Sequence, residues 1–271
     1  MLHHHSIEDL GHPELQPYLK FRDDRDHRDK GIFIAEGAKV TERLLQSDVP
    51  VRSLLLPEKW LTKLTPLIEE RKEDIHAFVA PKKQLEQLVG TSMYQGVNSV
   101  GVIPPPPTLE TIQRDRKDPL LIVAIDDLSG ADNVGTVARN GLAFGADAMI
   151  VGDTCCSAWL RKAVRTSMGT VFKLPVIESS SLPETLRELR KRGIQTIAAH
   201  AHTDKHSLSG IDLTGDTCIV LGAEGDGIRD EVLAECHRHV IVPMANIVDS
   251  LNVGSAGAVF LYEVARQRGQ V

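Results

Sequence analysis

Asn133, Gly135 and Arg139 are the first residues whose types and spacing could do chemistry. They follow an apolar run typical of a strand, and Asn133 is a plausible N-cap for the helix predicted to open there. Gly135 and Arg139 are four residues apart on one helix face, so the glycine removes bulk beside the guanidinium. A helix start with this cation suits a phosphate or a developing oxyanion, although a capped helix with a surface arginine would give the same pattern.

A glycine-rich turn follows a second apolar run, in the sequence Leu221-Gly222-Ala223-Glu224-Gly225-Asp226-Gly227. Glycines at the carboxyl end of a strand let the backbone approach a ligand closely, and such ends line the crevice where open α/β sheets bind ligands. The order G-x-x-G-x-G is neither the dinucleotide fingerprint nor a P-loop, which argues against a nucleotide-dependent oxidoreductase or kinase. A plain glycine-rich turn remains the alternative.

The third group lies within residues 241–258. Ser250 or Asp249 is predicted to cap a final helix, yet this helix carries Gly254 and Gly257. Each glycine costs a helix about 1 kcal/mol relative to alanine. Something must therefore approach the helix closely there: another backbone, a bound ligand or a second subunit.

Apolar runs and helical patterns alternate along the chain, which predicts an α/β fold. In the first part, strands are expected at residues 32–35, 51–56, 75–80 and 97–103, with helices at 39–46, 60–71 and 82–88. In the second part, strands are expected at residues 120–126, 148–151, 172–177, 195–199, 217–221 and 239–242, with a helix at 182–191. The continuous apolar run at 120–125 is typical of a buried parallel strand.

A run of four prolines, residues 104–107, indicates a domain boundary between the two parts. Prolines cannot donate hydrogen bonds to a sheet and force an extended path. The sequence therefore predicts a domain at residues 1–100, a proline-rich linker at 101–118 and a second domain at 119–271. Acidic and basic residues are divided evenly between the parts, so neither is a basic module.

The composition excludes several classes of protein. With 42% hydrophobic and 25% charged residues in 271, the chain is ordinary for a globular protein, and no apolar run approaches the roughly 20 residues of a membrane span. Four cysteines without C-x-x-C spacing indicate buried thiols. A net charge of −6 argues against indiscriminate binding of polyanions. Residues 1–5 contain no apolar signal core, so cytoplasm is expected, and the sequence leaves open whether the histidines at 3–5 are native.

Together the three groups resemble the SpoU (TrmH-like) family of the SPOUT class of RNA methyltransferases. Asn133-x-Gly135-x-x-x-Arg139 is similar to the first motif of that family, Gly222-x-Glu224-x-x-Gly227 to the second, and residues 242–253 to the third. Residues 165–169 are similar to a further family segment, and residues 33–37, followed by a helix, are similar to the L30e-like domain that many members carry.

The resemblance implies a C-terminal parallel sheet threaded as a trefoil knot, preceded by a small L30e-like α/β domain that binds RNA. It implies transfer of a methyl group from S-adenosylmethionine to a ribose 2′-hydroxyl in ribosomal or transfer RNA. It also implies a homodimer in which the arginine of one subunit faces the cofactor of the other.

The resemblance also implies roles for individual residues. The cofactor would lie among three loops, one of them at residues 199–201, and its predicted contacts are Ala199, His200, Leu221, Gly222, Gly227, Val242, Met244 and Leu251. Arg139 would grip a phosphate and stabilise the nascent alkoxide. The residues predicted to orient that arginine and the ribose are Asn133, Glu224, Ser250 and Asn252.

Basic residues in two places are candidate RNA contacts. Arg22 and Arg28 belong to a strip that alternates with aspartates, which a solvated row of ion pairs would equally explain. Arg161, Lys162 and Arg165 are less neutralised in the sequence and lie in the catalytic half, so they are the better phosphate contacts. His200, His202 and His206 could suggest a metal, but they lie in a predicted cofactor loop, and no metal is expected.

A second function is compatible with the same fold. A catalytically silent member would bind RNA without transferring a methyl group. The presence of Arg139 and Asn252 argues against that alternative.

Overall fold

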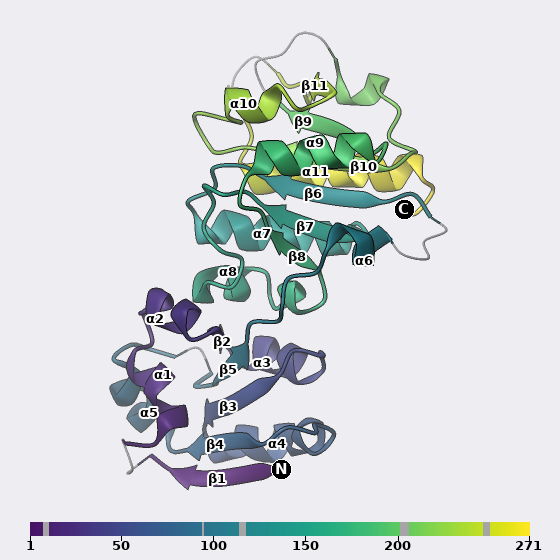
Figure 1. Ribbon diagram of the computed structural model, residues 1–271. Coiled ribbons are helices and arrows are strands. Elements are labelled where there is room, and N and C mark those ends of the chain that lie inside the picture. The colour runs from purple at the N-terminus through teal and green to yellow at the C-terminus, as the bar shows by residue number, and fades with distance from the viewer. Residues whose placement is uncertain (8–10, 94, 114–117, 201–205, 246–249) are drawn as a thin grey trace. The chain divides into compact units, whose positions relative to one another are not determined.

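The computed structural model describes residues 1–271 except 8–10, 94, 114–117, 201–205 and 246–249. Contacts divide the chain into two compact units, one formed by Met1–Pro105 with Trp159–Lys173 and one by Pro106–Ala158 with Leu174–Val271 (Figure 1). Both units are α/β, which confirms the predicted class.

The division differs from the predicted boundaries in two places. The predicted linker at residues 101–118 is itself divided, between Pro105 and Pro106. Residues 159–173 were expected in the second domain, but they pack with the first unit. The cause is aromatic packing, because the ring of Phe33 lies 5.1 Å from that of Trp159 and 5.5 Å from that of Phe172.

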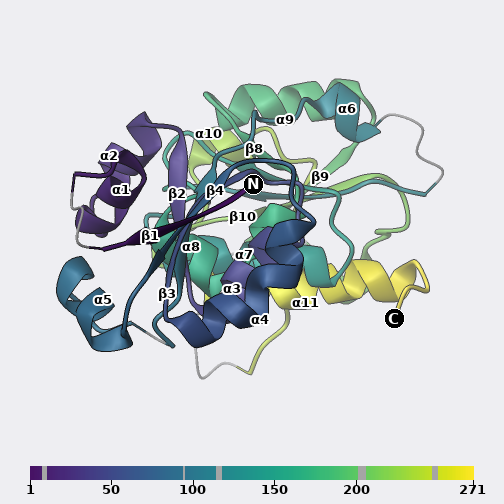
Figure 2. The same ribbon diagram turned by 90° about the horizontal axis from the view of Figure 1, so that it is seen from below.

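The first unit contains a mixed five-stranded sheet in the order β1-β4-β3-β5-β2. Its strands are β1 (Leu2–Ser6), β2 (Ile32–Glu36), β3 (Val51–Leu56), β4 (Ile75–Val79) and β5 (Asn98–Val102). Strands β1, β4 and β3 run parallel, whereas β5 is antiparallel to both β3 and β2. Figure 2 shows α3 (Ala38–Leu45) and α4 (Glu58–Glu69) on one face of the sheet, and α1 (Gln16–Leu19), α2 (Asp24–Asp29) and α5 (Lys82–Val89) on the other.

The second unit contains a parallel six-stranded sheet in the order β11-β9-β10-β6-β7-β8. Its strands are β6 (Leu121–Ile125), β7 (Ala148–Val151), β8 (Val176–Glu178), β9 (Gln195–Ala199), β10 (Thr217–Leu221) and β11 (Arg238–Val240). Helices α7 (Ala131–Ala143) and α11 (Val253–Gln267) cover one face, and α6 (Leu109–Gln113), α9 (Leu182–Lys191) and α10 (Asp230–Leu233) the other (Figure 2). Parallel strands bring the carboxyl ends of β9, β10 and β6 to one edge, where the predicted ligand loops follow.

Four segments differ from the sequence predictions. Residues 170–172 form a short 3₁₀ helix after the left-handed Gly169, so the strand expected at 172–177 is only β8. The predicted linker contains α6, whose Thr111 amide donates to the hydroxyl of Thr108. Strand β1 and helix α2 were not predicted, because a histidine run and a charged strip carry no apolar period.

Both predicted caps are wrong by two or three residues. Helix α7 begins after Gly130, so Asn133 lies inside its first turn. Helix α11 is capped by Asn252, whose side-chain oxygen accepts from the amides of Gly254 (2.9 Å) and Ser255 (3.4 Å), rather than by Ser250. Asp249, the other predicted cap, lies outside the described residues.

Close packing within the chain explains the two glycines of α11. A Cβ at Gly254 would lie 2.5 Å from Cγ2 of Thr136 on α7, and one at Gly257 would lie 2.9 Å from Cδ1 of Leu221 on β10. The side-chain amide of Asn140 also donates to the Gly254 carbonyl at 2.7 Å. Neither a ligand nor a second subunit is therefore needed to account for the small residues at these two positions.

Some expectations concern the chain as a whole. Cys218 is buried and the other cysteines are half-buried, and burial raises the pKa of the Cys155 thiol to about 11. Within the described ranges, no helix has both the length and the apolar character to cross a membrane. The knot implied by the resemblance stays a prediction, because strand order alone does not define threading.

Candidate functional site

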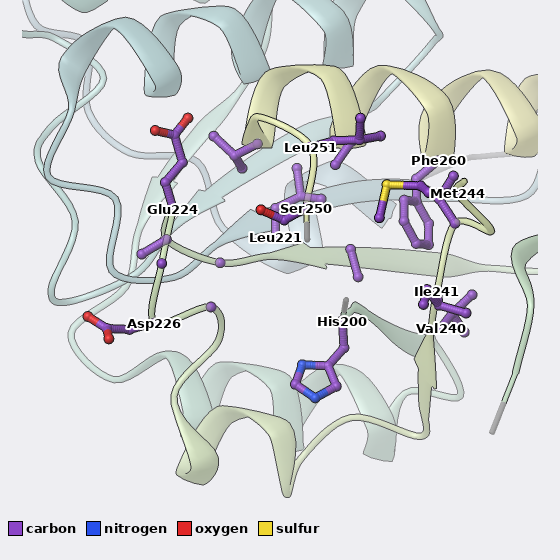
Figure 3. Close-up of a pocket in the computed structure, with 18 residues that line it drawn as sticks. His200, Leu221, Glu224, Asp226, Val240, Ile241, Met244, Ser250, Leu251 and Phe260 are labelled. Atoms are coloured by element: carbon purple, nitrogen blue, oxygen red, sulfur yellow. The ribbon is translucent and has the colours of Figure 1, made fainter. Parts of the chain in front are cut away.

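A pocket of about 460 Å³ opens at the carboxyl ends of β9, β10 and β11 and at the start of α11 (Figure 3). Glu224 and Asp226 lie at one end of it, and Met244 and Phe260 at the other (Figure 3). All eight residues predicted to contact the cofactor line this pocket: Ala199, His200, Leu221, Gly222, Gly227, Val242, Met244 and Leu251. Ala201 and His202 lie outside the described residues. Cofactor contact stays a prediction for each lining residue.

The glycine-rich turn after β10 forms one wall because its backbone folds tightly on itself. Ala223 and Gly227 exchange backbone hydrogen bonds of 2.8 and 3.2 Å, and the turn passes through Gly225 with a φ of +104°. A Cβ at Gly222 would lie 2.3 Å from the carbonyl carbon of Gly227, so only glycine fits there without moving the backbone.

Arg229 holds the end of this turn against the neighbouring strands. Its backbone amide and its guanidinium Nε each donate to the fully buried carboxylate of Asp126, both at 2.9 Å. The guanidinium also donates to Asp153 at 3.1 Å. These carboxylates raise the pKa of Arg229 above its usual range. Sequence reasoning missed this arrangement, although a polar residue directly after a buried strand, as Asp126 is, could have pointed to it.

Replacing Arg229 with methionine is expected to lower the free energy of unfolding by about 3 kcal/mol, because it leaves a buried carboxylate without its partner cation. Urea denaturation would measure the change. Glu231→Gln is the matched control, since the Glu231 side chain is 62% exposed in its ion pair with Arg229 and should change stability by less than about 1 kcal/mol. Equal effects of the two substitutions would contradict the importance assigned to Asp126.

Three of the predicted catalytic residues form a polar cluster beside the pocket: Asn133, Glu224 and Asn252. The side-chain amide of Asn133 donates to Glu224 at 3.2 Å. The amide of Asn252 donates to Asn133 at 3.2 Å and also to Glu224. Since Asn252 caps α11 through its other side-chain atom, the helix start orients this cluster. Ser250 does not join the cluster, but it lines the pocket.

Arg139 lies apart from the pocket of its own chain. It is exposed on α7, does not line the pocket and forms no hydrogen bond or ion pair with any residue that the structure describes. The structure of one chain therefore brings Asn133, Glu224 and Asn252 together but does not bring Arg139 to the cofactor loops.

Two of the predicted RNA contacts are engaged within the first unit. Arg161 and Arg165 both pair with the buried carboxylate of Glu36, Arg165 at 2.8 Å. The Arg161 guanidinium also lies over the ring of Phe21 at 4.7 Å. The expectation that these arginines are less neutralised and lie in the catalytic half is therefore wrong, because the fold supplies a counter-ion that is distant in sequence. Lys162 is exposed.

The charged strip at residues 20–30 is partly an ion-paired surface. Lys20 and Lys30 each lie 2.7 Å from Asp26, and these two cations lower the pKa of Asp26 to about 2. Arg22 and Arg28 are exposed at the same surface. The strip therefore contains ion pairs, as expected for a solvated row of paired charges, and it also contains exposed arginines.

Comparison with known proteins places this geometry in a family. Residues 120–262 match the SpoU rRNA Methylase family. A 23S rRNA (guanosine-2′-O-)-methyltransferase, RlmB of Photobacterium profundum, is 30% identical over 241 residues, which cover 86% of this chain and 96% of that protein. An uncharacterized tRNA/rRNA methyltransferase of Mycolicibacterium smegmatis is 32% identical over 193 residues, covering 69% of this chain but only 60% of that longer protein.

The fold of a solved SpoU methyltransferase matches that of this chain. The SpoU methyltransferase AviRb from Streptomyces viridochromogenes, solved in complex with the cofactor AdoMet, matches with a TM-score of 0.80 and 25% identity. The match covers 95% of this chain and 98% of that one. From its matched residues, its relatives and its fold, we conclude that this chain belongs to the SpoU rRNA methylase family.

Proposed function

We propose that this chain transfers a methyl group from S-adenosylmethionine to a ribose 2′-hydroxyl in ribosomal or transfer RNA in the cytoplasm. The observation that carries the proposal is the pocket, which all eight predicted cofactor residues line and which the polar cluster of Asn133, Glu224 and Asn252 adjoins. The 2′-hydroxyl specificity is supported by the relative RlmB alone. The RNA class is supported by RlmB and by the uncharacterized tRNA/rRNA methyltransferase of Mycolicibacterium smegmatis.

The residues of the pocket fit S-adenosylmethionine. Its volume of about 460 Å³ lies within the ordinary range of small-molecule sites. Leu221, Val242 and Leu251 supply apolar walls for a flat ring, and the surrounding loops supply backbone amides and carbonyls. Glu224 and Asp226 place negative charge at one end, which suits a cationic ligand. When bound, the cofactor supplies an activated methyl group.

The residues of the chain would position the ribose and stabilise its 2′-oxygen as the hydroxyl proton is lost. An arginine guanidinium is a permanent cation with several donors in one plane, so Arg139 would grip the phosphate next to the target ribose. It would also stabilise the negative charge that develops on the 2′-oxygen as the proton passes to a phosphate oxygen, a water molecule or a transiently neutral guanidinium. The side-chain amides of Asn133 and Asn252 would hold the ribose, because Glu224 fixes their orientation.

We further propose a homodimer in which Arg139 of one protomer reaches the pocket of its partner. Two observations support it. Arg139 is exposed and lies outside the pocket of its own chain. On α11, the helix that packs against α7, two large apolar side chains are exposed, Val259 by 38% and Tyr262 by 47%.

The first unit is proposed to be the L30e-like domain that binds the RNA substrate. The proposed phosphate contacts there are Arg22, Arg28 and Lys162, whose side chains are exposed. Arg161 and Arg165 would contribute only by exchanging Glu36 for a phosphate.

Incubation of the purified chain with methyl-labelled S-adenosylmethionine and total RNA tests the activity. Label is expected in alkali-resistant dinucleotides, because a methylated 2′-oxygen cannot attack the adjacent phosphate. RNA retained on the protein without any label would instead identify the catalytically silent alternative. Mapping the label in RNA from a deletion strain would distinguish ribosomal from transfer RNA.

A further inference from the structure

Three histidines from separate places in the sequence converge in the first unit. His5 lies on the edge strand β1, His76 on the neighbouring strand β4, and His12 immediately before the short 3₁₀ helix at Pro13–Leu15. One ring nitrogen from each lies within 4.8 Å of the others. The atoms His5 Nε2 and His76 Nδ1 are 2.9 Å apart.

The register of the sheet produces this convergence. In the parallel pair β1–β4, His3 is opposite His76 and His5 is opposite Phe78. Alternate residues of a strand share a face, so His3 and His5 lie on the side of His76, whereas His4 points to the other face and is exposed. The three consecutive histidines therefore lie in different environments: His3 and His5 face His76, and His4 is exposed on the opposite face.

The three rings form one packed group. Ring centroids are 4.4 Å apart for His5 and His12, 5.0 Å for His5 and His76, and 5.2 Å for His12 and His76. Phe78 closes one side, with its ring 5.2 Å from that of His5 and 5.1 Å from that of His12. All three histidines are half-buried, so the group is accessible to a small ion but is shielded from bulk water.

We propose that His5, His12 and His76 bind a divalent transition-metal ion, Zn²⁺, through three imidazole nitrogens. Imidazole is a preferred ligand of Zn²⁺, and three protein ligands leave the fourth tetrahedral position to water. This assignment departs from the absence of a metal expected from the sequence, because only the fold brings His5, His12 and His76 together.

The distances are close to those that such a site requires. With Zn–N bonds of about 2.0–2.1 Å, two nitrogens on a tetrahedral ion lie about 3.3 Å apart. The pair His5–His76, at 2.9 Å, needs almost no movement, and the widest pair closes by at most about 1.5 Å through ring rotation. The ion would replace the proton shared between His5 and His76, and His12 would give up the hydrogen bond that it accepts from the Glu14 amide.

Such a site would fasten the edge of the sheet. Strand β1 pairs only with β4 among the described strands, so its backbone is held on one side. A metal shared by β1, β4 and the segment before Pro13 would cross-link three parts of the unit. Binding to the folded state alone would then raise thermal stability in proportion to the free metal concentration.

Calorimetric titration of the chelator-treated full chain with Zn²⁺ tests the proposal. One equivalent is expected to bind, and His12→Ala and His76→Ala should each weaken binding by at least about 100-fold, more than the loss of an outer-shell partner costs. His4→Ala is the matched control: it shortens the histidine run without touching the site and should bind as the unmodified chain does. Normal binding by His12→Ala and His76→Ala, or equal weakening by His4→Ala, would identify chelation by the run itself and overturn the proposal.

A measurement on the unmodified chain tests the site even if the variants unfold. In histidine-ring NMR spectra, Zn²⁺ should shift the resonances of His5, His12 and His76 and leave those of His4 in place. The melting temperature of the unmodified chain should rise with Zn²⁺, and that of His76→Ala should not. Shifts confined to residues 3–5 would contradict the site.

Discussion

Replacing Arg139 with alanine is expected to reduce methyl transfer by about 100- to 1,000-fold, the usual effect of losing one donor to a developing oxyanion. The affinity for S-adenosylmethionine should remain unchanged, because Arg139 does not line the pocket of its own chain. Alanine is a good helix former, so α7 should persist. Single-turnover transfer and calorimetric cofactor binding, measured on the same preparation, would separate the two effects.

A matched control is Arg187→Ala, which removes another exposed arginine of the second unit, 52% exposed and paired with Glu235. It should leave transfer intact, since Arg187 lies on α9, on the face of the sheet opposite α7. Equal losses of cofactor affinity and transfer in Arg139→Ala would contradict the role assigned to this guanidinium.

Replacing Gly222 with alanine is expected to weaken cofactor binding by about 30-fold. The new Cβ would lie 2.3–2.5 Å from backbone atoms of Gly227 and Ile228, and a backbone cannot yield as a flexible side chain can. Overpacking of this kind costs about 1–3 kcal/mol, and about 2 kcal/mol corresponds to the 30-fold loss. Calorimetric titration with S-adenosylmethionine would measure it.

Gly215→Ala is the control for this substitution. A Cβ at Gly215 meets nothing within 4 Å, so the same chemical change should leave the affinity within about twofold, well below 1 kcal/mol. Unaltered binding by Gly222→Ala would show that the turn after β10 does not form a wall of the cofactor site.

The two variants together test the proposed dimer. If Arg139 acts on the pocket of the partner subunit, a mixed dimer of Arg139→Ala and Gly222→Ala contains one composite site with both parts intact. At a concentration of S-adenosylmethionine too low to occupy the Gly222→Ala pocket, each variant alone should transfer little, and mixing and re-annealing the two should then restore transfer. If the arginine acted within its own chain, every mixed site would lack one part and the mixture would stay inactive.

Local sequence patterns predicted most of the regular structure. The strands at residues 51–56, 148–151, 195–199 and 217–221 have the predicted bounds, because buried apolar runs signal themselves over a few residues. Strand β1 escaped prediction because pairing with β4 stabilises it, not its own composition. Its partner lies more than seventy positions away, as His5 and His76 illustrate.

The site could be predicted in part. The motif spacing and the family resemblance led to eight cofactor contacts, all of which line the pocket, and to the cluster of Asn133, Glu224 and Asn252. They did not lead to the pairing of Asp126 with Arg229, whose partners are 103 residues apart. They also misjudged Arg161 and Arg165, since Glu36 neutralises them from a distant strand.

The sequence by itself thus determined the α/β alternation, the three motif segments and the family to which they point. Those features rest on periodicity and spacing, which are properties of neighbouring residues. Tertiary structure alone decided which helix crowds Gly254, which carboxylate holds Arg229 and which histidines meet. Such contacts depend on strand order and register, and a shift of one residue in register would turn every side chain of a strand to the opposite face.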